Sequence, residues 1–512
     1  MITYEDTRGL IDQPRTFTAA LLEGIAPGGG LFVPEQLPRF SLHEVLALAQ
    51  LPYHERAALV YEAFGLDIAP ATTRAIAATA YGANFDDAQI APVREVAPGR
   101  FVLELWHGPT LAFKDMALQC MPLFFSQALT QAHTGGATDL DFLILVATSG
   151  DTGVAALNGF ADRAKTRICV YYPESGVSAL QKLQMVTQQG DNVMVFGLDG
   201  DFDACQSAVK GVFDDAEFAL ELADCHGLAT SSANSINWGR LMPQVVYYLS
   251  AYADMVAERA LPAGAPLDVC VPTGNFGNIL AAYYAKLMGA PLGRLFCACN
   301  ANKVLADFLA TGVYDISARP LVKTASPSMD ILVSSNLERL LYHLCGDDAL
   351  IRRWMTELKT TGCFIVDEGT RAKLSAEFSA GWVDDAACLQ TIGRVQREHG
   401  YLLDPHTAVA WDVAGALCDH EAPVLIVSTA HWSKFAADVV RGLEGIAPGL
   451  PVPGAGEDIE LLDRVVELVP DAVVPLQLQA VRRRAVRFRG RVGAGREAVE
   501  ASLREWLAGP TA

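Results

Sequence analysis

Long hydrophobic runs, a large charged fraction and an excess of basic residues are all missing from this sequence of 512 residues. No window approaches the 18 or more consecutive apolar residues of a membrane-spanning helix, which argues against an integral membrane protein. The net charge is −20, from 39 Lys and Arg against 59 Asp and Glu, so the long-range field repels nucleic acids and anionic membranes. The opening residues lack the basic and apolar regions of a signal peptide, and we expect a cytoplasmic protein with neither a nucleic-acid nor a membrane partner.

The sequence also lacks the cysteine patterns of metal sites and of disulfide-stabilised domains. Its 11 cysteines are scattered, mostly within apolar stretches, and no CxxC pair occurs. We therefore predict reduced thiols and no metal ion. Cys297 and Cys299 are the pair closest in sequence, and the alternation of side chains along a strand predicts that both lie on one face. Nothing in the sequence indicates an oligomeric state.

What the sequence does contain is a globular composition, with 51% hydrophobic and 19% charged residues. From about residue 140, short apolar runs alternate with longer amphipathic stretches, which is typical of βαβ units. The runs predicted as strands are 141–147, 167–172, 192–198, 267–272, 294–299 and 423–428. Because these runs are apolar at nearly every position, they predict mostly parallel sheets covered on both faces, in an open doubly wound α/β fold.

The two ends of the chain differ from this repeating part. The first hundred residues, with the glycine-rich turn 26–30, predict a separate helical and loop region. The Pro- and Gly-rich segment 447–456 predicts a linker into a terminal extension. Within the extension, residues 481–491 alternate valine and phenylalanine with arginine. We interpret this pattern as a half-exposed strand and not as a basic patch for nucleic acid, because the protein as a whole is acidic.

Small polar residues and glycines follow three of the predicted strands, where ligands bind in such folds. The segment 273–278 carries glycines that permit close approach of the backbone, and it begins a helix whose free N–H groups would bind an anion such as phosphate. The alternative is a glycine turn needed only for packing. In the segment 148–153, Asp151 argues against a second phosphate, so Ser149 and Thr152 could hold a substrate carboxylate; the alternative is a simple helix N-cap.

Lys114 is the residue most suited to covalent chemistry. Its neighbours at −3, −2, −1, +2, +3 and +4 are all apolar, so no solvent-facing stripe includes it. Burial would lower the pKa of its ammonium and expose a nucleophilic amine, which imine formation with an aldehyde requires. The alternative is a lysine that reaches the surface and pairs with Asp115. A buried amine, an anion-binding loop and a hydroxyl at a third strand end together match the needs of pyridoxal phosphate.

A series of longer motifs makes this hypothesis specific. In chain order they are HGPTLAFKDMALQ (107–119), TSGDTG (148–153), SANSINWGR (232–240), PTGNFGN (272–278), PSMDI (327–331), DPHTAVA (404–410) and STAH (428–431). This series resembles that of the threonine synthase family, and the resemblance extends to residues 7–9 and 24–35. It departs at Gly28, where the family commonly has aspartate, and at Trp432, which could alter the shape of the pocket.

The resemblance implies a pyridoxal-phosphate enzyme of fold type II that converts O-phospho-L-homoserine and water into L-threonine and phosphate. It implies an N-terminal domain at 1–95, a small domain at 96–235 with the reactive lysine, a large domain at 236–445 with the phosphate loop, and an extension at 446–512. Lys114 would form the imine with the cofactor. The resemblance also implies that Thr429 binds the ring nitrogen of the cofactor. Ser149, Asp151 and Thr152 would face the substrate carboxylate and the 3′ oxygen of the cofactor. The cofactor phosphate would be bound by Gly274, Asn275, Phe276, Gly277 and Asn278.

Two questions stay open at this level. The first is the product, because a phospho-lyase on the same scaffold would give 2-oxobutyrate, ammonia and phosphate, and a non-catalytic scaffold would give none. The second is the cation that receives the leaving phosphate. Its candidates are Lys182, Arg240 and Lys434, and the roles of Glu23, His107 and His431 are equally open.

Overall fold

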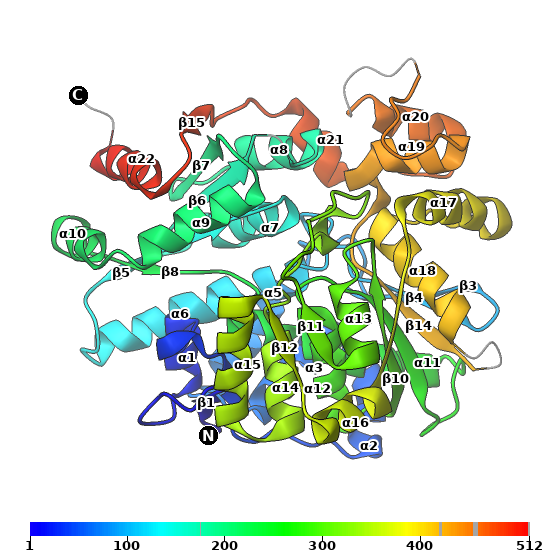
Figure 1. The fold of residues 1–512 in the computed structure, drawn as a ribbon, viewed down its shortest axis with the longest axis horizontal. Coiled ribbons are helices and arrows are strands. Elements are labelled where there is room, and N and C mark those ends of the chain that lie inside the picture. Colours follow the sequence, from blue (N-terminus) through cyan, green and yellow to red (C-terminus); the bar gives the residue numbers. More distant parts are fainter. Residues whose placement is uncertain (175, 419–421, 454–458, 510–512) are drawn as a thin grey trace.

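The computed structural model describes residues 1–174, 176–418, 422–453 and 459–509, and two sheets of mainly parallel strands dominate it (Figure 1). The larger sheet consists of β3 (Val93–Ala97), β4 (Arg100–Glu104), β9 (Leu267–Pro272), β10 (Leu292–Cys299), β13 (Phe378–Trp382) and β14 (Val424–Ser428). Its order is β13-β10-β9-β14-β4-β3, and all pairs are parallel except β3 with β4.

The smaller sheet consists of β5 (Asp141–Ala147), β6 (Thr166–Pro173), β7 (Val193–Leu198), β8 (Leu228–Ser231) and β15 (Gly490–Val492). Its order is β15-β7-β6-β5-β8, and every pair is parallel. The predicted doubly wound α/β fold with mostly parallel sheets is confirmed. The predicted domain boundaries stay predictions, but β4, the strand before Lys114, belongs to the larger sheet.

Helices cover both faces of each sheet. Around the larger sheet lie α11 (Trp238–Ala257), α12 (Gly277–Leu287), α13 (Val304–Thr311), α14 (Leu337–Cys345), α15 (Asp348–Thr361), α16 (Glu368–Glu377), α17 (Asp385–His399), α18 (Pro405–Leu417), α19 (Ala436–Glu444) and α20 (Leu461–Leu468). Around the smaller sheet lie α6 (Met121–Thr134), α7 (Asp151–Phe160), α8 (Ala179–Val186), α9 (Phe202–Phe213) and α10 (Ala216–His226). Along β14, alternate residues enter two different cores: Leu425 and Val427 join one, and Ile426 the other. Such double burial explains why the strands are apolar throughout.

The N-terminal region contains α1 (Phe17–Glu23), α2 (Leu42–Ala47), α3 (Tyr53–Ala63) and α4 (Pro70–Ala80), together with a hairpin of β1 (Tyr4–Asp6) and β2 (Phe32–Pro34). It shares its core with α11, because the rings of Tyr4 and Phe64 contact Trp238 at centroid distances of 5.7 and 5.8 Å.

A second short hairpin, outside the N-terminal region, pairs β11 (Val313–Asp315) with β12 (Cys363–Ile365). None of the described helices is long and apolar enough to cross a bilayer.

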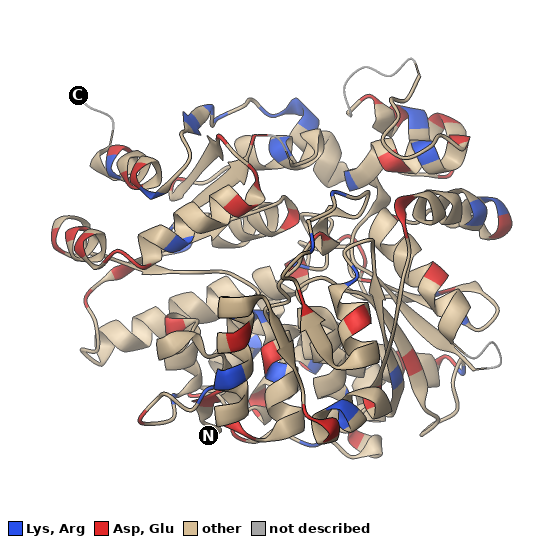
Figure 2. Ribbon diagram, in the orientation of Figure 1, with Lys and Arg blue, Asp and Glu red and all other residues tan. Residues whose placement is uncertain are grey.

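The C-terminal segment runs from the larger sheet back to the smaller one (Figure 1). It contains α21 (Leu476–Arg483), β15 and α22 (Arg496–Ala508), and α22 packs on α9. The predicted strand over 481–491 is wrong over most of its length, because α21 ends at Arg483 and β15 begins only at Gly490. Figure 2 shows basic residues along this segment, and ion pairs of Arg482 with Asp463 and of Arg491 with Glu174 engage them. Residues 454–456 of the predicted linker lie outside the described residues.

Candidate active site

The loop that carries Lys114 is fixed at the carboxyl ends of two neighbouring strands, β4 and β14. The N–H of Phe113 donates to the carbonyl of Thr429 at 2.8 Å, and the N–H of His431 donates to the carbonyl of Leu111 at 3.1 Å. An antiparallel bridge between Ala112 and Ala430 lies between these two bonds. The segment before Lys114 therefore pairs with the segment after β14, and the predicted residues Lys114 and Thr429 lie on the connections that follow two paired strands.

Lys114 is buried, with 9% of its surface exposed, as its apolar neighbours predict. Its Nζ lies 3.7 Å from Oδ2 of Asp151 at the start of α7, and not beside Asp115. Burial lowers the pKa of Lys114 to about 8, because the attraction of Asp151 offsets only part of the desolvation and the charges of Arg240 and Lys434 lower it further. Asp115 instead accepts hydrogen bonds from the backbone and hydroxyl of Thr110.

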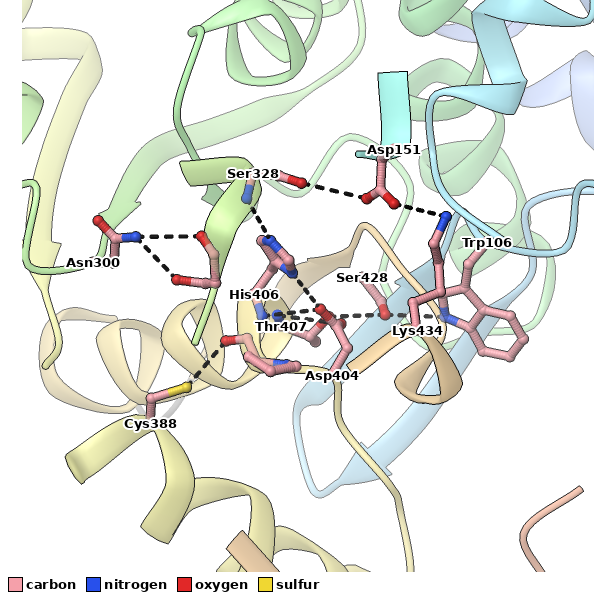
Figure 3. Close-up of polar contacts among 12 residues, drawn as sticks. Trp106, Asp151, Asn300, Ser328, Cys388, Asp404, His406, Thr407, Ser428 and Lys434 are labelled. Carbon is pink, nitrogen blue, oxygen red and sulfur yellow. Dashed lines mark hydrogen bonds and ion pairs between the residues drawn. The ribbon is translucent and has the colours of Figure 1, made fainter. Parts of the chain in front are cut away.

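Asp151 is the centre of a buried polar cluster (Figure 3). Its Oδ1 pairs with Nζ of Lys434 at 2.7 Å and accepts from Nε2 of Gln181 at 2.8 Å. Its Oδ2 accepts a long hydrogen bond from Oγ of Ser328 at 3.3 Å, on the side that also faces Lys114. Although burial alone would raise the pKa of Asp151, the charges of Lys434 and Lys114 and these hydrogen bonds hold it well below the usual range. The carboxylate is therefore charged and already has several partners.

The loop 148–153 is shaped by Thr148, which the sequence analysis did not single out. Its Oγ1 accepts from the N–H groups of Gly150 and Gly153 at 3.0 and 2.8 Å. Gly150 has φ +137°, and a side chain there would collide with Gln181. Ser149 and Thr152, the predicted substrate-binding hydroxyls, are half-buried on the same loop as Asp151.

The predicted phosphate loop links β9 to α12. Gly274 packs against the backbone of the turn 327–329, and its carbonyl accepts from Oγ of Ser334 at 2.6 Å. The carbonyl of Asn275 accepts from the N–H of Asn336 at 3.1 Å. Phe276 precedes α12 in the left-handed conformation, with φ +64°. The helix therefore starts abruptly after a glycine-containing turn, with the free N–H groups that bind anions.

Asn278, in the first turn of α12, has one satisfied and one unsatisfied side-chain atom. Its Oδ1 accepts from the hydroxyls of Tyr247 and Tyr248 at 2.8 and 2.5 Å. Its Nδ2 is buried without a hydrogen-bond partner among the described residues. Because a buried donor without a partner is costly, this N–H group is suited to donate a hydrogen bond to a bound ligand.

The candidate cations differ sharply in their surroundings. Lys182 pairs with Glu174 at 2.7 Å and is 36% exposed, so it belongs to the surface. Lys434 is buried against Asp151 and also donates to the carbonyl of Thr110 at 2.8 Å. Arg240, in the first turn of α11, is buried and donates to the carbonyl of Ala233, while its Nε has no partner within the described residues. Burial lowers the pKa of Arg240 to about 10.

The other groups left open by the sequence also have defined places. Glu23 pairs with Arg15 on the surface. His107 lies between Asp86 and Glu104; burial opposes its charge, but these hydrogen bonds raise its pKa to about 9. Burial lowers the pKa of His431 to about 3, which keeps its ring neutral.

Sequence reasoning missed several residues that hydrogen-bond to the residues of the candidate site and hold them in place. The motifs PSMDI and DPHTAVA carry Ser328 and His406, which form the cluster in Figure 3 together with Asp404. Neither motif was predicted to have a chemical role. Trp106 donates through Nε1 to Oγ of Ser428 at 3.0 Å, next to Thr429. Their position within ordered motifs was the available signal.

The arrangement is suited to a ligand that has both an aldehyde and a phosphate. The N-terminus of α12, the Nδ2 of Asn278 and the Nε of Arg240 offer donors that have no acceptor among the described residues. To these the site adds the buried amine of Lys114, with Oδ2 of Asp151 at 3.7 Å as its ion-pair partner. Such a donor set fits pyridoxal phosphate and an anionic substrate. In the described part of the chain, no three or more His, Cys, Asp or Glu side chains are arranged so that they could hold a metal ion.

Two family models match the chain: "Threonine synthase N terminus" over residues 3–81 and "Pyridoxal-phosphate dependent enzyme" over 97–429. Threonine synthase-like 1 from Homo sapiens is 45% identical over 84% of this chain, and the match spans 58% of that protein's length. Threonine synthase from Pseudomonas aeruginosa is 40% identical over 88% of this chain and 92% of its own. Among solved structures, the PLP-bound threonine synthase from Brucella melitensis has 36% identity and a TM-score of 0.85, and the yeast threonine synthase has 30% and 0.86; each match covers 99% of both chains.

Proposed function

Because this chain belongs to the threonine synthase family of pyridoxal-phosphate-dependent enzymes, we propose that it converts O-phospho-L-homoserine and water into L-threonine and inorganic phosphate. The observation that carries the proposal is Lys114, a buried amine 3.7 Å from Asp151 whose pKa is lowered to about 8. The charge of Arg240, which has no carboxylate partner among the described residues, contributes to this lowering. The alternative products 2-oxobutyrate and ammonia are an outcome of the test.

The cofactor would be held by residues with a clear physical reason to bind it. Lys114 would bind it covalently, the N–H groups of 274–278 would bind its phosphate, and the Thr429 hydroxyl would bind its ring nitrogen. The glycine-containing turn before α12 and the unsatisfied Nδ2 of Asn278 support the phosphate assignment. When bound, pyridoxal phosphate supplies an electron sink for carbon acids.

Lys114 is also the proposed proton carrier of the reaction. An amine with a pKa of about 8 is populated in both protonation states near neutral pH, so it can take a proton at Cα of the substrate and return one at Cβ or Cγ. Asp151, 3.7 Å away, stabilises the ammonium form after proton uptake, while Arg240 and Lys434 favour its release. Ser149 and Thr152 would orient the substrate carboxylate.

Arg240 is the residue that we propose for the substrate phosphate. Lys182 is engaged at the surface and Lys434 is engaged by Asp151, whereas burial of Arg240 is offset by no carboxylate in the described ranges. A buried guanidinium without an acid is costly, and a dianionic phosphate would satisfy it.

The test is identification of the organic product by mass spectrometry when the purified, cofactor-loaded protein receives O-phospho-L-homoserine. We expect threonine and phosphate in equal amounts. Lys114→Ala is expected to lower the rate at least about 1,000-fold, because it removes both the covalent anchor and the proton carrier. Lys210→Ala, an exposed lysine on α9, is the matched control and should retain full activity.

Each other outcome has a definite meaning. 2-Oxobutyrate without threonine would keep the role of Lys114 but assign the protein as a phospho-lyase. Threonine formation by Lys114→Ala at the wild-type rate would refute the assigned lysine. No product from the wild-type protein would refute the proposed substrate.

A further inference from the structure

His406 lies at the centre of a buried hydrogen-bond chain that the proposed reaction does not use (Figure 3). It occupies the first turn of α18 and is 2% exposed. Its Nδ1 lies 2.8 Å from Oδ1 of Asp404, and its Nε2 accepts from the backbone N–H of Ser328 at 3.2 Å. Because Nε2 accepts a hydrogen bond, the ring proton is on Nδ1 and is donated to Asp404. Asp404 thereby fixes both the tautomer and the orientation of the ring.

Ser328 connects this histidine to the smaller sheet. It lies in the turn η3 (Pro327–Met329), next to the phosphate loop, where a side chain on Gly274 would come within 2.9 Å of the Ser328 carbonyl. Its hydroxyl donates across to Oδ2 of Asp151, which begins a helix that packs on the smaller sheet. The single residue Ser328 therefore contacts the phosphate loop, His406 and the carboxylate beside Lys114.

We propose that His406 is a positioning residue: through the backbone of Ser328 it holds the Ser328 hydroxyl on Asp151, and so limits how closely that carboxylate pairs with Lys114. The inference rests on the proposed function of Lys114 as the reactive amine. It adds a role for three residues, Asp404, His406 and Ser328, which act on the amine of Lys114 only through Asp151.

The physical link is the sharing of one oxygen. Oδ2 of Asp151 faces both the Ser328 hydroxyl at 3.3 Å and Nζ of Lys114 at 3.7 Å. When the hydroxyl is withdrawn, Oδ2 is free to pair more closely with the ammonium and to favour its charged form. The remaining charges that face Lys114 are those of Arg240 on α11 and Lys434 after β14, and both oppose this change. The pKa of Lys114 is then expected to rise.

A purely structural role for His406 makes a different prediction. Loss of the ring would lower stability, but it would not change the protonation of an amine on another loop. The titration of Lys114 therefore separates the two roles, and it needs neither substrate nor turnover.

The experiment measures this titration in the full-length chain freed of cofactor. The protein is labelled briefly with an acetylating N-hydroxysuccinimide ester between pH 6 and 10, and the Lys114 peptide is quantified by mass spectrometry. His406→Gln and His406→Asn are a matched pair, because the glutamine amide can reach the place of Nε2 and the asparagine amide ends near that of Nδ1. Ser328→Ala keeps the backbone N–H and removes the hydroxyl. Thermal unfolding checks that each variant is folded.

The expected result is an upward shift of the labelling midpoint by about half a pH unit or more in His406→Asn and in Ser328→Ala, with His406→Gln close to the wild type. The double variant His406→Asn/Ser328→Ala should shift no further than either single variant, because both changes remove the same hydrogen bond. A folded His406→Asn protein with the wild-type midpoint would overturn the proposal, and so would additive shifts in the double variant. If His406→Asn does not fold, an unshifted midpoint in Ser328→Ala overturns it. Failure of the chain to form threonine would leave these midpoints unaffected, so the two proposals fail separately.

Discussion

Two buried arginines show how the surroundings of a residue distinguish binding from support. Arg339 on α14 is satisfied, with hydrogen bonds to the carbonyls of Phe32 and Ile236 and to Oδ1 of Asn336. Among the described residues, Arg240 donates to a single carbonyl, that of Ala233, and its Nε has no partner. A buried guanidinium whose N–H groups are all hydrogen-bonded stabilises the fold. One that has unpaired N–H groups is costly, and a bound anion would supply the missing acceptors.

We therefore expect Arg240→Gln to raise the KM for O-phospho-L-homoserine by about 10- to 100-fold, equivalent to the loss of charged hydrogen bonds of about 1.5–3 kcal/mol. Its melting temperature should be unchanged or higher, because a costly buried charge is removed. Arg339→Gln is the contrasting variant and should lower the free energy of unfolding by about 1–3 kcal/mol. Steady-state kinetics and thermal unfolding measure both quantities, and an unchanged KM in Arg240→Gln would reject its assignment to the substrate phosphate.

At the same scale, the sequence predicted the burial of Lys114 but not its partner. Apolar neighbours on both sides left no exposed stripe, and the residue is buried as predicted. The carboxylate that it faces is Asp151, not the adjacent Asp115, because α5 (Asp115–Leu118) packs on α7 and brings together two segments that are distant in sequence. Ser328 and His406 were out of reach for the same reason: a hydrogen bond between residues 78 positions apart leaves no local pattern.

Among the elements, the strands of continuous apolar sequence were predicted well and the others were not. The predicted runs 141–147 and 267–272 coincide with β5 and β9. Strand β3 was missed, since it lies at an edge and its residues are mostly exposed or half-buried. The strand prediction for 481–491 was wrong because the alternation of apolar residues with arginines in this exposed segment does not mark the face of a sheet. Its arginines instead pair with nearby carboxylates. Burial on two faces is thus what the sequence records most clearly.

The start of α12 gives a prediction at the scale of an element. A Cβ on Gly274 would lie 2.9 Å from the carbonyl oxygen of Ser328 and 3.2 Å from Cα of Met329, so backbone would have to move. A Cβ on Gly277 would meet only the amide of Asn336, at 3.4 Å. We expect Gly274→Ala to weaken pyridoxal phosphate binding more than about 10-fold, with Gly277→Ala within about threefold of the wild type. Fluorescence titration with the cofactor measures both, and equal losses would show that the packing of Gly274 is not what shapes the loop.

On the scale of the whole molecule, the C-terminal segment joins parts that no pattern in the sequence connects. It leaves the region of the larger sheet, adds β15 to the edge of the smaller sheet and ends with α22 on α9. Between the two sheets, the segment contributes Leu478 of α21 to a small buried cluster. The other buried members are Leu111, from the Lys114 loop, and Leu180, from α8. Leu180 precedes Gln181, the partner of Asp151. The segment therefore packs against the Lys114 loop and against α8, whose Gln181 bonds Asp151.

Removing Leu478 should loosen the Lys114 loop and α8 as well as α21. The side chain is fully buried, so Leu478→Ala is expected to lower the free energy of unfolding by about 2–4 kcal/mol, whereas Leu476→Ala, at a position 77% exposed, should change it by less than about 0.5 kcal/mol. Because the cluster includes Leu111 and Leu180, hydrogen exchange should accelerate in the peptides covering 105–114 and 178–186, far from α21 in sequence. Hydrogen-exchange mass spectrometry of the two variants makes this comparison. Faster exchange confined to 474–484 would mean that the segment caps the surface without supporting the site, while acceleration in all three regions would make the C-terminal segment part of the framework that holds Lys114 and Asp151 together.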